Sequence, residues 1–205
     1  PSRSPPIQDP NTIGEKLTGK CKETQKINPT NPYSASKAAA EIIINSHKYA
    51  YKKEIITVRG NNVYGIRQYP EKLIPVVISS CLNNKQIPVY GEGKNIRDWI
   101  HVLDHCHGIL KVVEKGEFGE VYNFGSDNEL ENIEIIKKII NILDTPSSLI
   151  EFVKDRPGHD FRYAVNSDKA KSKLGWSPNI DFDSGIEDTV MWYVKNKVWM
   201  SKVLS

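Results

Sequence analysis

Apolar and polar residues follow two different periods along the chain, and these periods predict an α/β protein. An apolar stripe at helical spacing predicts a helix from about Tyr33 to Tyr51, and the short β-branched run at 54–60 predicts a buried strand after it. The same patterns predict further strands at 87–91, 97–102, 120–125 and 149–155, and further helices at 73–82, 104–114, 132–144, 167–176 and 183–200. Because strands and helices alternate through the first two thirds of the chain, at least part of the sheet should be parallel.

Turn-forming residues mark where the predicted elements begin and end. Residues 1–31 are rich in Pro, Asn, Gly and Lys without a sustained period, so we predict a loop there, and a second loop at 61–72. Ser167 is placed to cap the start of the helix at 167–176, and Gly175 lies just past its end.

The most informative side chains are a phenol and an amine four positions apart at the start of the first helix. Pro32 cannot extend a helix backward and the alanines that follow are strong helix formers, so the helix should begin near Tyr33. Positions i and i+4 share a helix face, so the Lys37 ammonium should lie near the Tyr33 hydroxyl. An ammonium beside a phenol lowers the pKa of the phenol, which suits proton removal from an alcohol while a cofactor takes the hydride. A helix can also carry this pair without any chemistry.

Composition and charge exclude several classes of protein. The chain has 205 residues, enough for one medium domain or part of a two-domain enzyme, and its net charge is +3 with scattered basic residues. We therefore expect neither a nucleic-acid surface nor a membrane surface, and no apolar run is of transmembrane length. Cys21, Cys81 and Cys106 are odd in number and far apart, which predicts no disulfide framework and no zinc site, and fits a reducing, cytosolic setting.

No Gly-rich turn of the kind that binds a dinucleotide connects a strand to a helix in this sequence. The glycines Gly91 and Gly93 follow a short predicted strand, but they open no helix and lack the third glycine. A protein that uses Tyr33 and Lys37 against a nicotinamide normally carries that turn upstream. We therefore expect this chain to be the rear portion of something longer.

Polar side chains near predicted strand ends and helix starts are candidates for binding phosphate. Asn62 directly follows a buried strand, and Lys72 lies at a predicted helix N-terminus, where an ammonium and helix amides together favour an anion. Arg97 and Arg156 lie beside short strands and could fork onto a phosphate, with Asp98 orienting Arg97. Without a ligand, Asn62 would belong to an Asn-rich turn, Lys72 would be a surface lysine, and the two arginines would lie in salt-bridged loops.

Several potential metal ligands lie close together in the sequence, but the residues around them are not typical of a metal site. His101, His105 and His107 lie close to Asp104 and Cys106. Their neighbours predict the start of a core-facing helix, and no HExxH arrangement occurs. We predict no metal.

Five segments of the chain carry a family resemblance. They are NPTNPYSASKAAAE, NNVYGIRQYPEKLIP, IPVYGEGKNIRDWIHVLDH, GEVYNFG and DRPGHDFRYAVNSDKAKSKLGW. In order and spacing they resemble the dTDP-glucose 4,6-dehydratases, which belong to the extended short-chain dehydrogenase/reductase superfamily. The resemblance runs from about Asn28 to the terminal helix. YSASK is shared across the superfamily, whereas YPEKLIP, RDW and DRPGHDFRY separate this family from related epimerases and decarboxylases.

The resemblance implies NAD as cofactor, a dTDP-sugar as substrate and a role for each matching residue. Tyr33 would take the proton of the sugar 4-hydroxyl as the C4 hydride passes to NAD, and Lys37 would lower the pKa of Tyr33 and bind the nicotinamide ribose. Asn62 would contact the cofactor and the diphosphate region of the substrate. The other substrate contacts would be Lys72 and Leu73 at a phosphate, Pro88 and Tyr90 against the base, and Arg97, Asn123, Arg156 and His159 at the diphosphate and nucleoside.

The resemblance is expected to stop abruptly ahead of Asn28. The family's dinucleotide turn would lie upstream of Pro1, and its Thr-Asp-Glu segment, which removes water across C5 and C6, would align with Gln8, Asp9 and Pro10. Only the aspartate is kept there, so we assign no elimination role to Asp9. The chain could be a fragment, a mis-spliced product, a degenerate paralogue or one part of a two-chain enzyme. We favour the fragment and predict that it is inactive alone.

These expectations combine into a partial Rossmann-like parallel sheet with a small C-terminal α/β domain that binds the nucleotide sugar. Residues 1–27 would be a loop or disordered lead-in. Residues 28–66 would be a remnant of the NAD-binding domain, whose elements recur around 98–125, and 67–205 would mainly bind the nucleotide sugar. The expected function is that of a cytoplasmic dTDP-glucose 4,6-dehydratase, homodimeric when complete. The alternatives are an epimerase or decarboxylase of the same superfamily and a nonenzymatic nucleotide-sugar-binding paralogue.

Overall fold

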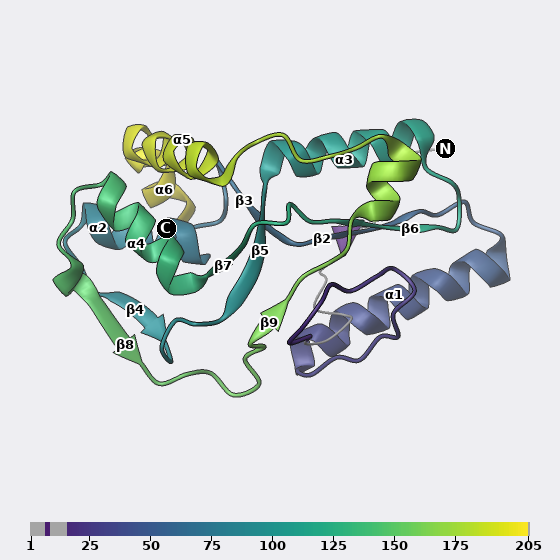
Figure 1. Ribbon diagram of the computed structural model, residues 1–205, viewed down its shortest axis with the longest axis horizontal. Helices are drawn as coiled ribbons and strands as arrows, with labels where there is room; N and C mark the ends of the chain where they lie inside the picture. Colours follow the sequence, from purple (N-terminus) through teal and green to yellow (C-terminus); the bar gives the residue numbers. More distant parts are fainter. Residues whose placement is uncertain (1–6, 9–15, 205) are drawn as a thin grey trace.

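A computed structural model of the chain describes residues 7–8 and 16–204 and shows the predicted α/β fold with parallel strand pairs (Figure 1). The first sheet is parallel throughout and has the order β1-β2-β6. Its strands are β1 (Ile7–Gln8), β2 (Thr57–Gly60) and β6 (Val121–Phe124).

β1 corrects the loop predicted over residues 1–31. Two residues are too few to show a period, but Ile7 and Gln8 pair in parallel with Val58 and Arg59 of β2. Asp9 and Pro10, where the family's elimination residues would align, lie outside the described residues.

α1 (Pro32–Tyr51) begins where the sequence predicts. The side chain of Asn31 accepts a hydrogen bond from the Ser34 amide at 2.9 Å and so caps the first turn, where Pro32 also lies. The helix ends at Lys52, whose backbone is left-handed with φ 51°.

α1 packs on the sheet along a narrower face than its apolar stripe predicts. Ala38 and Glu41 are buried, and the Glu41 carboxylate forms a 2.5 Å ion pair with Arg59 of β2. Ile42 and Ile43 point away from this face and are 59% and 57% exposed. Described residues therefore leave these two isoleucines largely uncovered.

The second sheet is built around β5 (Ile96–His101). β3 (Asn62–Tyr64) pairs with it in parallel, β7 (Glu129–Glu131) pairs with it antiparallel, and β9 (Arg162–Tyr163) runs parallel to its first residues. β3, β7 and β9 were not predicted, because two- or three-residue strands carry no readable period.

The chain crosses from the first sheet to the second at Asn61. The side-chain amide of Asn61 donates to a carboxylate oxygen of Asp98 at 3.0 Å, which holds the crossing against β5. Asn62 therefore opens a strand, β3, inside the segment 61–72 that was predicted as loop.

One end of the molecule gathers four helices beside a separate pair of parallel strands (Figure 1). The strands are β4 (Ile87–Tyr90) and β8 (Ile150–Val153), with a 3-10 turn at Ser147–Leu149 before β8. The helices are α2 (Leu73–Leu82), α4 (Asn132–Ile142), α5 (Phe182–Lys195) and α6 (Lys197–Leu204). Their isoleucines, valines and aromatic rings form one core with Trp99 of β5. The single terminal helix predicted at 183–200 is thus two helices, interrupted at Asn196.

A second core lies between the first sheet and α3 (Val102–Lys115). Phe124 of β6 packs edge to face on Trp176, with ring centroids 4.6 Å apart. The helix predicted at 167–176 is a short helical turn, in which residues 168–169 are α-helical and Ala170–Leu174 form a π-helix that ends at Gly175 as expected. No helix in the described part of the chain is both long and apolar enough to cross a membrane.

Ser167 does not cap that turn. Its hydroxyl accepts a hydrogen bond from the Gly125 amide and donates one to the Gly125 carbonyl, so it joins the turn to the end of β6. The Asn166 side chain accepts a hydrogen bond from the Asp168 amide just ahead of the π-helical residues.

Candidate functional site

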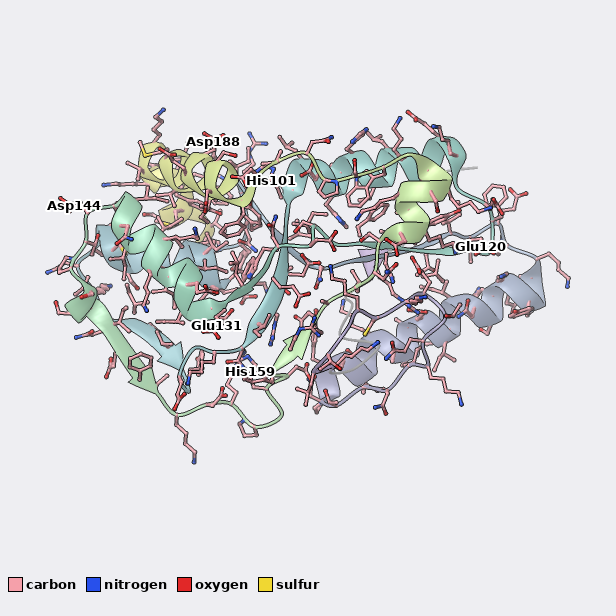
Figure 2. The ribbon with its side chains drawn as sticks, viewed as in Figure 1. His101, Glu120, Glu131, Asp144, His159 and Asp188 are labelled. Atoms are coloured by element: carbon pink, nitrogen blue, oxygen red, sulfur yellow. The ribbon has the colours of Figure 1, made fainter. Side chains whose placement is uncertain are left out.

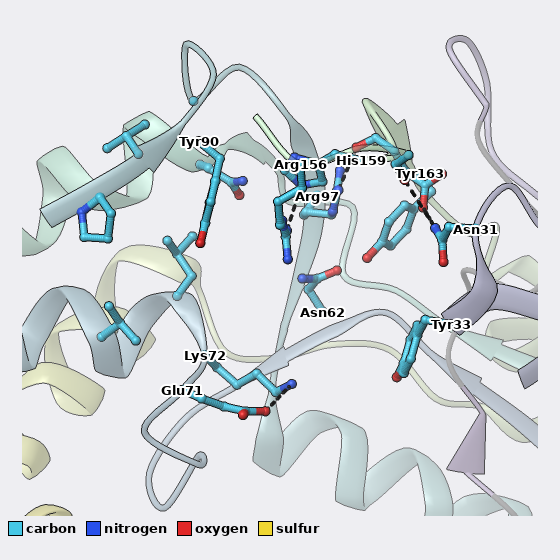
Figure 3. A pocket seen from close by; sticks show the side chains of 18 of the residues that line it. Asn31, Tyr33, Asn62, Glu71, Lys72, Tyr90, Arg97, Arg156, His159 and Tyr163 are labelled. Carbon is cyan, nitrogen blue, oxygen red and sulfur yellow. Dashed lines mark hydrogen bonds and ion pairs between the residues drawn. The ribbon is translucent and has the colours of Figure 1, made fainter. Parts of the chain in front are cut away.

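A cavity of about 720 Å³ lies where three helices begin (Figure 3). Tyr33 near the start of α1, Leu73 of α2 and Asn132 of α4 all line it. The predicted site residues that line it are Tyr33, Asn62, Lys72, Leu73, Pro88, Tyr90, Arg97, Arg156 and His159. A helix N-terminus carries partial positive charge and free amide groups, so three of them around one cavity favour an anionic ligand.

Tyr33 and Lys37 lie together on one side of α1. The Lys37 ammonium is 5.5 Å from the centre of the Tyr33 ring, as their spacing predicts. Tyr33 is 53% exposed at the edge of the cavity, and Figure 3 shows Asn62 between it and Lys72 in this view. Lys37 itself does not line the cavity.

Lys72 is the residue just before α2 and has no side-chain capping bond to the helix. Its ammonium lies 3.0 Å from the Glu71 carboxylate, and both side chains are more than half exposed. An exposed pair of this kind is weak and exchanges readily for another anion. The lysine is therefore available to a phosphate at the start of α2.

Arg97 is fixed by backbone carbonyls. Its guanidinium donates to the carbonyls of Ile96, Phe161 and Asp160 at 2.7, 3.2 and 2.7 Å, and lies 4.3 Å from the centre of the Tyr163 ring. These contacts leave the group charged and rigid at the cavity wall.

Asp98 does not orient Arg97, contrary to the prediction. Neighbouring residues of a strand point to opposite faces, so the Asp98 carboxylate lies on the other side of β5. There it accepts hydrogen bonds from Asn61, from the Ser126 amide and hydroxyl, and from the Asn128 amide. Burial raises the pKa of Asp98, and the hydrogen bonds from Ser126 and Asn61 oppose that shift.

Arg156 and His159 come from the segment that joins β8 to β9, where Figure 2 shows His159. The Arg156 guanidinium lies 3.1 Å from Nε2 of His159 and 4.9 Å from the centre of the Tyr90 ring. A second cation and a flat ring therefore stand together at the wall formed by β4 (Figure 3).

Asp160 joins this segment to the start of α1. Its carboxylate accepts from the Thr30 hydroxyl at 2.5 Å and from the Asn31 side-chain amide at 3.3 Å. Its backbone carbonyl accepts from Arg97. Because Asn31 caps α1, one buried aspartate links the helix that carries Tyr33 to the cationic wall.

Asn123 is not in the cavity. It is fully buried in β6, where its side-chain amide donates to the Cys21 carbonyl at 3.1 Å. Asn132, which was not predicted, lines the cavity instead. Its position as the first residue of a predicted helix was the available signal, because amides at a helix start face anions.

Charge and shape together describe what the cavity can hold. Lys72, Arg97 and Arg156 supply positive charge, and Tyr90 and Tyr163 supply flat apolar faces. The volume lies within the range of roughly 300–1,000 Å³ that is usual for small-molecule sites. An elongated ligand with a phosphate portion and a flat ring fits this description.

Comparisons with known proteins agree with this description. The model of a family described as GDP-mannose 4,6 dehydratase matches residues 12–189. The dTDP-glucose 4,6-dehydratase of Xanthomonas campestris pv. campestris (strain ATCC 33913) is 44% identical over 202 residues, which cover 94% of this chain and 57% of that protein. The chain thus spans little more than half the length of this relative.

Two solved structures of dTDP-glucose 4,6-dehydratases share the fold. The enzyme from Bacillus anthracis str. Ames, in complex with NAD, has a TM-score of 0.91 at 41% identity, over 96% of this chain and 63% of that one. The enzyme from Streptomyces venezuelae, also with NAD bound, has a TM-score of 0.94 at 34% identity, over 96% of this chain and 61% of that one.

The family match corrects one expectation and confirms another. It begins at residue 12, so the expected abrupt stop ahead of Asn28 is wrong. The predicted resemblance to the nucleotide-sugar 4,6-dehydratases is confirmed over most of the chain. The chain belongs to the family described as GDP-mannose 4,6 dehydratase, and it is similar to dTDP-glucose 4,6-dehydratases.

Proposed function

We propose that this chain provides the substrate site and the Tyr33–Lys37 pair of a dTDP-glucose 4,6-dehydratase. The observation that carries the proposal is a single cavity lined by the Tyr33 phenol and by the cations Lys72, Arg97 and Arg156. A ligand whose diphosphate binds those cations would present its sugar to Tyr33.

Each part of the substrate has a matching part of the cavity wall. Arg97 and Arg156 would bind the diphosphate, and Pro88 and Tyr90 would lie against the base. Asn132 takes the place that the resemblance assigned to Asn123, because Asn132 lines the cavity. Lys72 and Leu73 would bind a phosphate at the start of α2, and Asn62 would lie between diphosphate and sugar.

The proposed chemistry of the complete enzyme removes water from the sugar without net oxidation. Tyr33 would accept the proton of the 4-hydroxyl, and the nearby Lys37 ammonium would stabilise the phenolate. NAD, when bound, supplies the hydride chemistry at C4 and C6. Tyr33 is half exposed at the cavity edge, which leaves room for a nicotinamide beside it, and Lys37 would hold the ribose. The product would be the 4-keto-6-deoxy sugar.

Calorimetry with dTDP, UDP and GDP tests the substrate class. We expect dTDP to bind most tightly, and Arg156→Ala to weaken its binding about tenfold or more, because the substitution removes a charge-assisted bond to phosphate. Lys94→Ala is the matched control, since Lys94 is an exposed cation that does not line the cavity. Absence of dTDP binding, or a preference for UDP or GDP, would contradict the proposal. A preference for UDP would favour the epimerase or decarboxylase alternative.

Turnover assays test whether the chain is active alone. We propose that it is not, because it carries the Tyr/Lys pair but no Gly-rich dinucleotide turn. Conversion of dTDP-glucose by the 205-residue chain above the level of a Tyr33→Phe variant would show this to be wrong. For the nonenzymatic alternative, the complete gene product would bind dTDP but not NAD.

The remaining expectations about the complete protein are also proposals. Two separate cores support the division into residues 28–66, with elements around 98–125, and a region from 67 onward that binds the nucleotide sugar. The exposed Ile42 and Ile43 on α1 support a homodimer formed through that helix. The three cysteines are free, which supports a cytoplasmic location.

A further inference from the structure

The segment after β8 carries a carboxylate, Asp155, that has no part in the proposed function. Asp155 Oδ1 lies 2.7 Å from Nδ1 of His159 and also accepts the Arg156 amide at 2.7 Å. The hydrogen bond with His159 is the main cause that lowers the pKa of the Asp155 carboxyl, so this group is ionised near neutral pH. Asp155 does not line the cavity, whereas Arg156 and His159 do.

The contacts on the two sides of the His159 ring fix where its proton lies. An arginine guanidinium can only donate, so Nε2 of His159 must accept from Arg156 at 3.1 Å. A neutral imidazole then carries its proton on Nδ1, which donates to Asp155. Asp155 favours this tautomer in the same way that a buried aspartate orients the histidine of a catalytic triad.

The same contacts hold the guanidinium in place. Arg156 is bonded by His159 on one side and stacked 4.9 Å from the centre of the Tyr90 ring. Asp155 is packed against the turn that follows Tyr90: a Cβ added to Gly91 would lie 3.2 Å from Oδ2 of Asp155. The Gly91 amide also donates to the Val153 carbonyl, which closes β4 onto the start of this segment. Asp155, His159 and Arg156 therefore form one row against the end of β4.

We propose that Asp155 is a positioning residue for nucleotide binding, and that it acts through His159 to hold the Arg156 guanidinium ready for the diphosphate. The inference rests on the proposed function, since it assumes an anionic nucleotide as ligand. A cation that is already ordered loses less side-chain freedom when the ligand binds. On this account His159 serves first to orient Arg156, in addition to any contact of its own with substrate.

Three variants test the proposal. Asp155→Ala removes the acceptor for Nδ1. Asp155→Asn keeps a side-chain oxygen that can accept the hydrogen bond from Nδ1–H of His159. This variant should therefore keep part of the affinity for dTDP. Glu92→Gln is the matched control, because Glu92 is an exposed carboxylate on the turn after β4, paired with Lys94 and outside the cavity. The first measurement on each variant is the tautomer of His159 in the unliganded chain, from ¹H–¹⁵N spectra in which the His159 signals are assigned by comparison with His159→Gln. The second measurement is the affinity for dTDP and for thymidine.

The expected results separate positioning from a general structural effect. Without its acceptor for Nδ1–H, His159 in Asp155→Ala should populate the Nε2–H tautomer, which cannot accept from Arg156. This variant should therefore bind dTDP about three- to tenfold more weakly, with thymidine affinity unchanged. Asp155→Asn should keep the tautomer and most of the dTDP affinity, and Glu92→Gln should match the parent chain. If Asp155→Ala keeps the Nδ1–H tautomer, or loses affinity for dTDP and thymidine equally, the proposal is overturned.

The tautomer measurement also separates this proposal from the proposed function. If the parent chain shows the Nδ1–H tautomer but binds no dTDP, the proposed function fails while the row of contacts stands. If the parent chain binds dTDP but His159 carries its proton on Nε2, the proposed role of Asp155 is overturned while the proposed function stands.

Discussion

At the scale of single residues, the buried polar groups carry the sharpest consequences. Glu41 and Arg59 are each 2% exposed and neutralise one another between α1 and β2. His105 is 5% exposed, and neither of its ring nitrogens has a hydrogen-bond partner among the described residues. A buried charge that loses its partner lowers the stability of the fold, and so does a buried base that gains a proton. The ion pair and His105 should therefore each affect the free energy of unfolding.

Removing one partner of the buried ion pair should destabilise the chain strongly. Glu41→Ala leaves the Arg59 guanidinium buried without its carboxylate, and we expect the free energy of unfolding in urea to fall by about 3 kcal/mol. Glu114→Ala is the control, since it removes an exposed carboxylate from its surface pair with Lys111 and should change little. Equal effects of the two substitutions would contradict the buried pairing.

His105 should make the chain less stable as the pH falls. Burial lowers the pKa of His105 from 6.5 to about 4, so the unfolded chain binds this proton more readily than the folded one between those values. From pH 7 to pH 5 this single group should reduce the free energy of unfolding by about 2 kcal/mol. Urea unfolding of the parent chain and of His105→Leu at both pH values isolates that difference. Parallel pH dependence in the two proteins would show that His105 is not buried in its neutral form.

At the scale of elements, α1 is the helix whose placement matters most for the proposed chemistry. Its N-cap residue, Asn31, donates to the Asp160 carboxylate and to the Gly158 carbonyl. Its middle is held by Glu41 and Arg59, and its last turns by Lys48, which donates to the Gly119 carbonyl. Each of these contacts should therefore affect the order of the helix.

Asp160→Asn should loosen the start of α1. The substitution keeps the shape of the side chain but removes the charged acceptor for Thr30 and Asn31. We expect hydrogen exchange at the Ser34 amide, which Asn31 caps, to become about two- to tenfold faster. Asp168→Asn is the control, because the Asp168 carboxylate accepts an exposed hydrogen bond from the Asn166 side chain. Unchanged exchange at Ser34 would mean that Asp160 does not anchor the helix.

The elements that the sequence predicted well are those with a long enough pattern. The apolar runs of α2 and α4 span three turns or so, and both helices begin at the predicted residue. β1, β7 and β9 have only two or three residues, and their extended shape follows from pairing with β2 and β5. Pairing between distant segments leaves no mark on a short stretch of sequence, so these strands could not be predicted.

At the scale of the whole molecule, the cavity is assembled from segments that are distant in sequence. Four different elements or loops supply the cavity residues Tyr33, Lys72, Arg97 and Arg156. The sequence segments that carry the family resemblance identified all four residues. Asn123 was predicted and does not belong, because residues near Cys21 pack over β6 and take up its amide. That packing is a long-range contact, and an asparagine inside an apolar strand looks the same from sequence whether or not a ligand faces it.

A crystal structure of this chain with dTDP would show where the nucleotide binds. We predict that the diphosphate contacts Arg97 and Arg156, that the base lies against Tyr90, and that the open end of the ligand points toward Tyr33. A nucleotide bound elsewhere, or bound in this cavity with its diphosphate away from both arginines, would show that the proposed substrate site is wrong.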